Sequence, residues 1–429
     1  MLFRSQLSIM RGLTKWADRI TSPAAAPGLV NEAFRRLLSG RKRPVALECA
    51  MDTWGRKTPV ELPTAAAKAD PCPVDDDGVE RAAKLLGSAQ RPLIVVGGGA
   101  QGAGEHVLKI AEMLEAPVAT GRMGQGVIDG RHRLSVTSLA GYRFWTEADV
   151  VLAVGTRLQP QQMNWGMDDD LKIIRIDIDS EELDRQRKPE IGIVGDATAT
   201  LKALANRLAG HNAKRNGRAD QVAQTKAEAS KKIRDTLGPQ ISYLEAIRAA
   251  LPEDGILVDE LTQMGYAARL AYPTYKSRTF LSPGYQGTLG WGYATSLGVK
   301  VAKPDTPVLS ISGDGGFLFT AMEMSTAAQN GIGVVSVVFS DGAYGNVKRI
   351  QQQTFNNRTI ASDLHNPDFV KLGESFGIAS ERAKSPAELG AAISRGISRG
   401  GPTLIDCPVG PLPDPWALVA LPRARPRRS

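Results

Sequence analysis

The chain has 429 residues, of which 42% are hydrophobic and 23% are charged, as expected for a soluble protein of two or three domains. Because no apolar stretch reaches the roughly 18 residues that span a bilayer, the sequence predicts no membrane partner. The formal net charge of +8 is modest, so nucleic acid is not expected as a partner. Part of this charge lies in a proline-interrupted tail that we expect to be solvated and disordered. Its arginines are Arg423, Arg425, Arg427 and Arg428.

The cysteines and histidines show no pattern of a disulfide framework or a zinc site. The three cysteines are far apart and odd in number, which favours a reducing compartment, and we predict a cytoplasmic protein. The four histidines lack metal-ligand spacing. We interpret the basic first 17 residues as an ordinary segment rather than a transit peptide.

The first region, residues 1–62, is predicted to form helix, helix and strand. Ser22 is a plausible N-cap for a helix over 22–38, and 44–48 has the composition of a short strand. About 60 residues are too few for an independent core. We therefore predict that 1–62 is the end of a larger domain.

A proline- and alanine-rich segment, 63–75, is predicted to be a linker, and residues 76–208 follow as a second domain. Short apolar strands alternate there with helical segments, a pattern typical of a doubly wound parallel sheet. The expected strands are 92–96, 117–120, 150–154 and 173–178, with a helix over 106–114. This domain is predicted to be Rossmann-like.

Residues 209–236 are polar and charged and are interpreted as a linking helix or mobile connector. The third domain, 238–415, repeats the α/β alternation. Its predicted helices are 241–251, 293–302, 317–330 and 386–398, and its predicted strands are 255–259, 306–312, 332–339 and 403–406. The fold class is therefore α/β, with two doubly wound parallel-sheet domains and the remnant of a third.

Two acidic turns in the third domain carry the strongest functional signal. Gly313–Asp314–Gly315–Gly316 follows one predicted strand, and Asp341 begins a second turn after the next strand, 27 residues on (341 − 314 = 27). Mg²⁺ prefers oxygen ligands and is usually shared with a substrate phosphate. Asp314, Asp341 and the Ala343 carbonyl could supply three oxygens, while glycines and a helix N-terminus admit an anion.

These turns resemble the signature of thiamine-diphosphate-dependent enzymes of the acetolactate synthase, benzoylformate decarboxylase and pyruvate decarboxylase group. That signature is Gly-Asp-Gly followed, somewhat under thirty residues later, by Asn-Asn or Asn-Asp; here it ends in Ser340–Asp341, with Ser340 a departure. The chain resembles the C-terminal two-thirds of such an enzyme. The resemblance implies thiamine diphosphate and Mg²⁺ as cofactors, with Asp314, Asp341 and the Ala343 carbonyl as metal ligands.

The resemblance also implies which residues contact the cofactor. Leu289 matches a bulky residue that bends the cofactor, although alone it could be a plain core leucine, and the Gly287 carbonyl matches the acceptor for the cofactor's amino group. Glu260 could merely cap the next helix. The implied binding residues are Thr262, Gln263, Gly287, Thr288, Leu289, Gly313, Asp314, Gly315, Gly316, Asp341, Ala343, Tyr344, Gly345 and Asn346.

The central domain matches one that binds FAD in some family members. Because Gly97–Gly98–Gly99 lacks the spacing of a dinucleotide fingerprint, a structural role is favoured over FAD binding. Acetolactate synthases usually carry a tryptophan where Ile350 aligns, which argues against that specific activity.

Residues 1–62 resemble only the last elements of the family's pyrimidine-binding domain, and neither Glu32 nor Glu48 matches its catalytic glutamate. No catalytic residue is assigned. The resemblance implies a 2-oxo acid as substrate and a homodimer or tetramer, or a partner chain carrying the pyrimidine domain. The alternative is a non-catalytic fragment or subunit.

Overall fold

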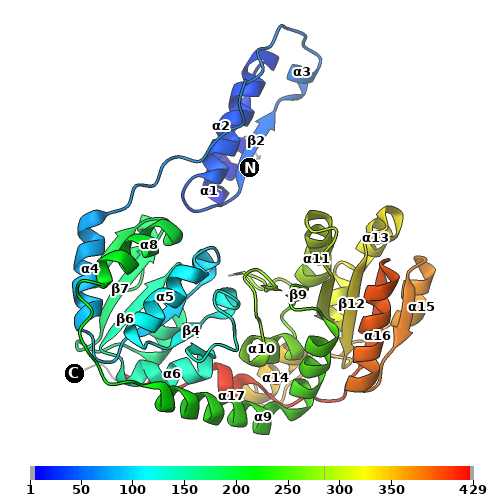
Figure 1. The fold of residues 1–429 in the computed structure, drawn as a ribbon. Coiled ribbons are helices and arrows are strands. Elements are labelled where there is room, and N and C mark those ends of the chain that lie inside the picture. The colour runs from blue at the N-terminus through cyan, green and yellow to red at the C-terminus, as the bar shows by residue number, and fades with distance from the viewer. Residues whose placement is uncertain (1–4, 285, 426–429) are drawn as a thin grey trace.

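The computed structural model describes residues 5–284 and 286–425, arranged as an N-terminal unit and two sheet-containing domains (Figure 1). Each domain is built on a six-stranded sheet whose paired strands are all parallel and are flanked by helices. The predicted α/β fold class is therefore confirmed. Among the described residues, no helix is long and apolar enough to cross a membrane.

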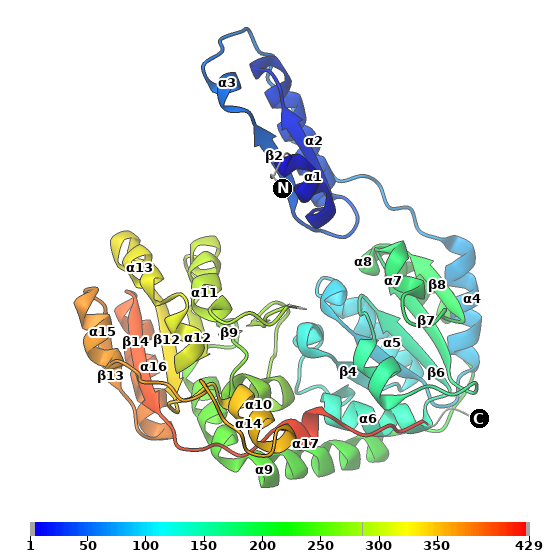
Figure 2. The same ribbon diagram turned by 180° about the vertical axis from the view of Figure 1, so that it is seen from behind.

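The N-terminal unit is a small α/β element that projects from the central domain, which it contacts through ion pairs of Arg41 and Arg43 with Asp179 and Glu182 (Figures 1 and 2). Its elements are α1 (Gln6–Leu13), β1 (Trp16–Ile20), η1 (Pro23–Ala25), α2 (Ala26–Leu38), β2 (Val45–Cys49) and α3 (Met51–Trp54). The predicted order of helix, helix and strand missed β1, which pairs in parallel with β2. Residues 55–75 contain no helix or strand and lead into α4 (Asp76–Ser88).

The central sheet has the strand order β5-β4-β3-β6-β7-β8, which is the 3-2-1-4-5-6 order of Rossmann folds. Its strands are β3 (Leu93–Val96), β4 (Val118–Thr120), β5 (Ser135–Val136), β6 (Val150–Val154), β7 (Lys172–Asp177) and β8 (Ile191–Val194). Its other helical elements are η2 (Gly98–Ala100), α5 (Gly104–Leu114), η3 (Arg122–Gly124), α6 (Ser138–Glu147), η4 (Gln161–Trp165), α7 (Ser180–Asp184) and α8 (Ala197–Leu208).

The glycine turn after β3 packs directly on the turn after β6. A Cβ on Gly97 would lie 2.4 Å from the Gly155 carbonyl oxygen, and one on Gly99 would lie 2.7 Å from the Gly155 Cα. Both contacts are with backbone atoms, which cannot move aside. The packing of the two turns accounts for these glycines and favours the structural interpretation of the motif.

A long helix, α9 (Ala219–Ala250), runs beneath both domains (Figure 2). The predicted linking helix and the helix predicted over 241–251 both lie within this element and meet at a kink, where the backbone of Leu237 is non-helical. The buried Val222, Ala229 and Ile233 lie seven and four residues apart, so they form one apolar stripe on an otherwise charged helix.

The C-terminal sheet has the order β10-β9-β11-β12-β14-β13. Its strands are β9 (Ile256–Asp259), β10 (Phe280–Leu281), β11 (Val308–Gly313), β12 (Val334–Ser340), β13 (Ala379–Arg382) and β14 (Thr403–Pro408). Its helices are α10 (Gln263–Ala271), α11 (Trp291–Ala302), α12 (Asp314–Leu318), η5 (Ala321–Glu323), α13 (Met324–Asn330), α14 (Gly345–Thr354), α15 (Phe369–Ser375), α16 (Pro386–Arg399) and α17 (Trp416–Val419). The helix predicted over 317–330 is thus divided into α12, η5 and α13.

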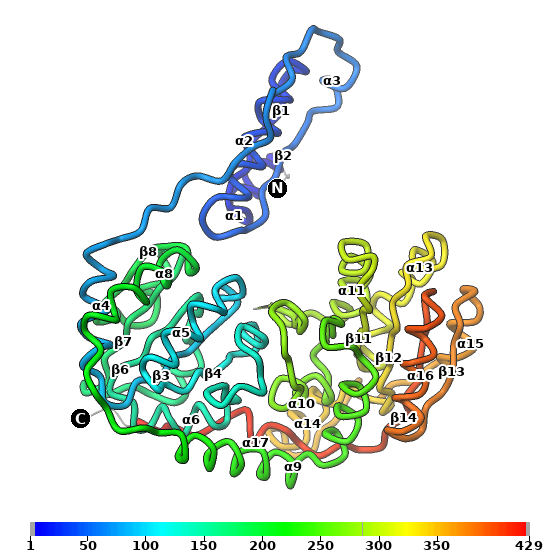
Figure 3. The backbone as a smooth tube through the Cα atoms, in the orientation of Figure 1, coloured from blue at the N-terminus to red at the C-terminus, as the bar shows by residue number. Residues whose placement is uncertain are grey.

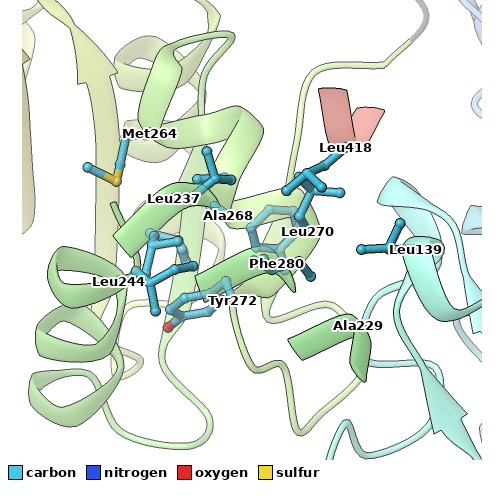
Figure 4. Packing of buried hydrophobic residues seen from close by; sticks show 14 of the residues in the cluster. Leu139, Ala229, Leu237, Leu244, Met264, Ala268, Leu270, Tyr272, Phe280 and Leu418 are labelled. Carbon is cyan, nitrogen blue, oxygen red and sulfur yellow. The ribbon is translucent and has the colours of Figure 1, made fainter. Parts of the chain in front are cut away.

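One hydrophobic cluster joins the two domains. It includes Leu139 of α6, Ala229 of α9, Leu270 of α10 and Leu418 of α17, all buried (Figure 4). Because these side chains come from both sheets' helices and from the linking helix, the central and C-terminal domains share a continuous core.

The C-terminal segment packs back onto the central domain, and the prediction of a solvated tail was wrong for its described part (Figure 3). Arg425 is 5% exposed; its guanidinium donates to the Trp145 carbonyl at 2.8 Å and to Asp168 at 2.7 Å. Arg427 and Arg428 lie outside the described residues. The buried guanidinium donates to carbonyl and carboxylate oxygens of the protein instead of to water. The amino-acid composition of the segment does not predict such contacts.

Candidate cofactor and metal site

A cavity of about 240 Å³ lies at the carboxyl ends of the C-terminal sheet. Strand order reverses between β9 and β11, and ligands of open α/β sheets bind at such a switch point. Every predicted binding residue except Thr288 lines this cavity. The lining members of that set are Thr262, Gln263, Gly287, Leu289, Gly313, Asp314, Gly315, Gly316, Asp341, Ala343, Tyr344, Gly345 and Asn346.

Three helices begin at the cavity wall: α10, α12 and α14. The first residues of each line the cavity, and Thr262 caps α10 by accepting a hydrogen bond from the Gly265 N–H at 3.0 Å. The first turns of a helix leave N–H groups without intrahelical partners and carry the positive end of the helix dipole. Their convergence suits a ligand with several negative charges.

Asp314 is held by N–H donors from three segments. Its Oδ1 accepts from the Gly315 N–H at 2.8 Å; its Oδ2 accepts from the Gly342 N–H at 2.7 Å and from Asn366 Nδ2 at 2.6 Å. The side chain is 1% exposed. These bonds fix the carboxylate of the first acidic turn against the second turn, where the chain reverses at Gly342 with a φ of 74°.

Asp341 shares this buried region with Asp314. Its Oδ1 accepts from the Ala343 N–H at 3.1 Å. Burial, and then the charge of Asp314, raise the pKa of Asp341 to about 6. Among the described residues, neither carboxylate forms a salt bridge with a side chain. Lys348 partly opposes the rise in the pKa of Asp341 without forming a salt bridge to it. Two adjacent acids without an ion-pair partner fit a bound divalent metal.

The remaining donors also fit a metal shared with a phosphate. Within the described residues, no group of three or more histidine, cysteine and acidic side chains is placed to hold a metal. Two carboxylates leave an octahedral shell incomplete, so carbonyl and phosphate oxygens would have to complete it. The buried Gln263 amide lies against Gly345, and its Oε1 has no partner among the described residues. That amide is available to a ligand.

Asn366 is a site residue that sequence reasoning missed. It lies on a segment that crosses the second acidic turn: the Tyr344 N–H donates to the Ser362 carbonyl, and the Leu364 N–H donates to the Gly342 carbonyl, both at 2.8 Å. Asn366 Oδ1 is buried without a partner in the described structure. No motif marks this asparagine, which follows Asp314 by 52 residues.

The structure bears on two residues whose roles were left open: Leu289, which could be a plain core leucine, and Glu260, which could cap the next helix. Leu289 lines the cavity and is 38% exposed, so it is not a core leucine. Glu260 does not cap α10, because Thr262 does. Glu260 is instead fully buried beside Gly290, whose N–H donates to its Oε1.

Asp259 gives the chain a stability that depends on pH. Its side chain is fully buried, Arg269 Nε donates to it at 3.0 Å, and burial raises its pKa from 3.8 to about 6 against the opposing effect of Arg269. A folded-state pKa above the unfolded value means that the folded chain binds the proton more tightly. Its contribution to stability is therefore present below pH 3.8 and is lost as pH rises through about 6.

We expect Asp259→Asn to remove this dependence, since asparagine does not titrate. The difference in free energy of unfolding between wild type and Asp259→Asn should change by about 2 kcal/mol between pH 4 and pH 7. Urea unfolding followed by circular dichroism at the two pH values measures it. A difference that is the same at both would contradict the assigned titration.

Comparison with known proteins places the chain in a family. Residues 79–204 match the central domain of thiamine pyrophosphate enzymes, and residues 261–407 match their C-terminal TPP binding domain. The second match contains both acidic turns. The recognition made from the Gly-Asp-Gly signature is thereby confirmed.

Similar proteins carry several activities. A probable acetolactate synthase large subunit of Methanocaldococcus jannaschii is 31% identical over 436 residues, covering 94% of this chain and 73% of that protein. A probable 2-ketoarginine decarboxylase of Pseudomonas aeruginosa is 30% identical, with the same coverages. A probable sulfoacetaldehyde acetyltransferase of Rhizobium meliloti is 27% identical, covering 91% and 72%. On these matches, the chain belongs to the thiamine pyrophosphate enzyme family.

Proposed function

We propose that this chain binds thiamine diphosphate through Mg²⁺, with Asp314, Asp341 and the Ala343 carbonyl as the metal ligands. The observation that carries the proposal is the pair of adjacent carboxylates, Asp314 buried and Asp341 half-buried, which form no salt bridge among the described residues and lie where three helices begin. The metal would neutralise the carboxylates and the diphosphate together, while the free N–H groups of the helix starts would bind the remaining phosphate oxygens.

The chain's residues have separate roles in this proposal. Thr262 and Gln263 contact the diphosphate from α10, and Tyr344, Gly345 and Asn346 do so from the start of α14. Leu289 supports the cofactor on the opposite side. Thr288 lies between Gly287 and Leu289 but does not itself line the described cavity, so we propose that it positions these two neighbours.

We propose a 2-oxo acid as substrate, as for the 2-ketoarginine decarboxylase among the relatives. Bound thiamine diphosphate supplies the electron sink that decarboxylation or carboligation requires. Part of the cavity wall is lined by apolar and aromatic side chains, which would exclude water from the reacting carbon. Its residues are Met264, Tyr266, Val347, Val409 and Leu412.

Catalysis in this scheme needs a carboxylate from outside the described cavity. Among the described residues that line the cavity, the carboxylates are Asp314 and Asp341, and both are assigned to the metal. We propose that the glutamate acting on the cofactor's pyrimidine comes from a pyrimidine-binding domain, in a homodimer or tetramer or on a partner chain. The alternative is a chain that binds the cofactor without catalysis.

Thermal unfolding of the full chain tests cofactor binding. Stabilisation should need both components, because the metal links the carboxylates to the diphosphate. With cofactor in about 100-fold excess over its Kd, Tm should rise by about 5 °C when thiamine diphosphate and Mg²⁺ are added together. Mg²⁺ with thiamine, which has no phosphate, is the control. Equal shifts with thiamine and thiamine diphosphate would refute a diphosphate site.

A further inference from the structure

Glu260 is a buried acid without a described cationic partner. It directly follows β9, is fully buried, and takes part in no salt bridge within the described structure. Its Oε2 has no hydrogen-bond partner among the described residues, and neither does the nearby Ser312 hydroxyl. Burying a carboxyl in this way is costly, so its contacts are expected to serve the site.

The contacts of Glu260 join the two glycine turns of the cavity. Its Oε1 accepts from the Gly290 N–H, at the end of the segment that carries Leu289. On its other side, a Cβ on Gly316 would lie 2.8 Å from the Glu260 carboxyl atoms, so the carboxyl packs directly against the Gly313–Gly316 turn. One side chain therefore touches both walls of the cavity.

Gly290 is bound from its other side as well. Its carbonyl accepts a hydrogen bond from the Thr320 Oγ1 at 3.0 Å. Its φ is 82°, and a Cβ there would lie 2.8 Å from Phe319 Cβ and 2.9 Å from Thr320 Cγ2. Glycine is thus required by conformation and by space, and both polar groups of this residue are fixed by side chains from other segments.

We propose that Glu260 and Thr320 are positioning residues that clamp Gly290 and thereby fix Leu289 relative to the Gly313–Asp314–Gly315–Gly316 turn. Leu289 is adjacent to the clamped residue and is 38% exposed in the cavity, so packing alone does not hold it. The same group of hydrogen bonds then fixes the position of Leu289 relative to the turn that carries Asp314. The clamp's role in cofactor binding rests on the proposed function; the clamp itself rests on these contacts.

Hydrogen–deuterium exchange of the full chain without cofactor tests the clamp directly. Glu260→Ala and Thr320→Val each remove one of its hydrogen bonds. Each should speed exchange in the segment 286–292 by about tenfold, as expected for a loss near 1.4 kcal/mol. Glu260→Gln and Thr320→Ser keep an acceptor and a hydroxyl, and both should exchange like wild type. Exchange in β3 and β6 reports on global destabilisation, which would affect all segments.

A second readout concerns the cofactor. With Mg²⁺ present, the affinity for thiamine diphosphate should fall about tenfold in Glu260→Ala and Thr320→Val and recover in the two conservative variants. Thr326→Val is the matched control, because the hydroxyl of the exposed Thr326 donates to Glu323 at 2.8 Å, away from the cavity. Unchanged segment exchange in both disruptive variants would overturn the clamp. If wild type fails to bind the cofactor, the proposed function falls, and the exchange result still decides the clamp.

Discussion

Replacing Asp314 by alanine is expected to abolish Mg²⁺-dependent binding of thiamine diphosphate. The carboxylate is 1% exposed, lies beside Asp341, and is fixed by three N–H donors, so it offers the metal a preorganised ligand. Losing a charged ligand should weaken binding at least about 100-fold, or roughly 3 kcal/mol. Equilibrium dialysis with labelled cofactor at saturating Mg²⁺ measures the loss.

Two further variants separate metal binding from folding. Asp341→Asn keeps an oxygen donor and should cost less affinity than Asp341→Ala, whereas a purely structural role would not rank the two in this order. Asp235→Ala is the matched control, because its side chain is 60% exposed on α9 and pairs with Lys231 at 2.5 Å, away from the cavity. An affinity of Asp314→Ala equal to that of wild type would remove Asp314 from the metal site.

Turnover of 2-oxo acids by the purified chain alone is the second large expected effect, and we expect it to remain near the rate of the free cofactor. The two carboxylates of the described cavity lining are assigned to the metal in our proposal, which leaves no further carboxylate in that lining. A positioned acid–base group contributes about 10² to 10⁴ in rate. Release of carbon dioxide from pyruvate and from benzoylformate, with cofactor and Mg²⁺ saturating, is the measurement.

The positive control is a relative with an assigned activity, assayed under the same conditions. The Asp314→Ala variant then shows whether any residual rate depends on the site. Robust turnover that this variant eliminates would mean that a catalytic group is present within this chain, contrary to the proposal of a separate pyrimidine-binding domain.

Much of the site could be predicted because it is encoded by short turns at strand ends. The Gly313–Gly316 turn and the Asp341 turn follow β11 and β12, which are neighbours in a parallel sheet, so their carboxyl ends lie together. A strand–turn–helix pattern with glycine and aspartate is visible in the sequence, and strand neighbours can be inferred from the α/β alternation.

The missed features depend on contacts between distant segments. Asn366 reaches Asp314 from a loop without regular structure, and nothing around it in the sequence marks the contact. Glu260 follows a strand and precedes a helix, where an acid commonly caps, and its actual partner, Gly290, is 30 residues away.

The most direct test of a metal-dependent diphosphate site is a calorimetric titration of the full wild-type chain with thiamine diphosphate. The titration is made once with Mg²⁺ and once after chelation of divalent ions. If a metal bridges the Asp314–Asp341 pair and the diphosphate, the chain should bind thiamine diphosphate saturably in the presence of Mg²⁺. After chelation, no binding should be measurable. Equal affinity in both conditions would contradict the account, because the two carboxylates would then repel the diphosphate rather than bind it through a shared cation.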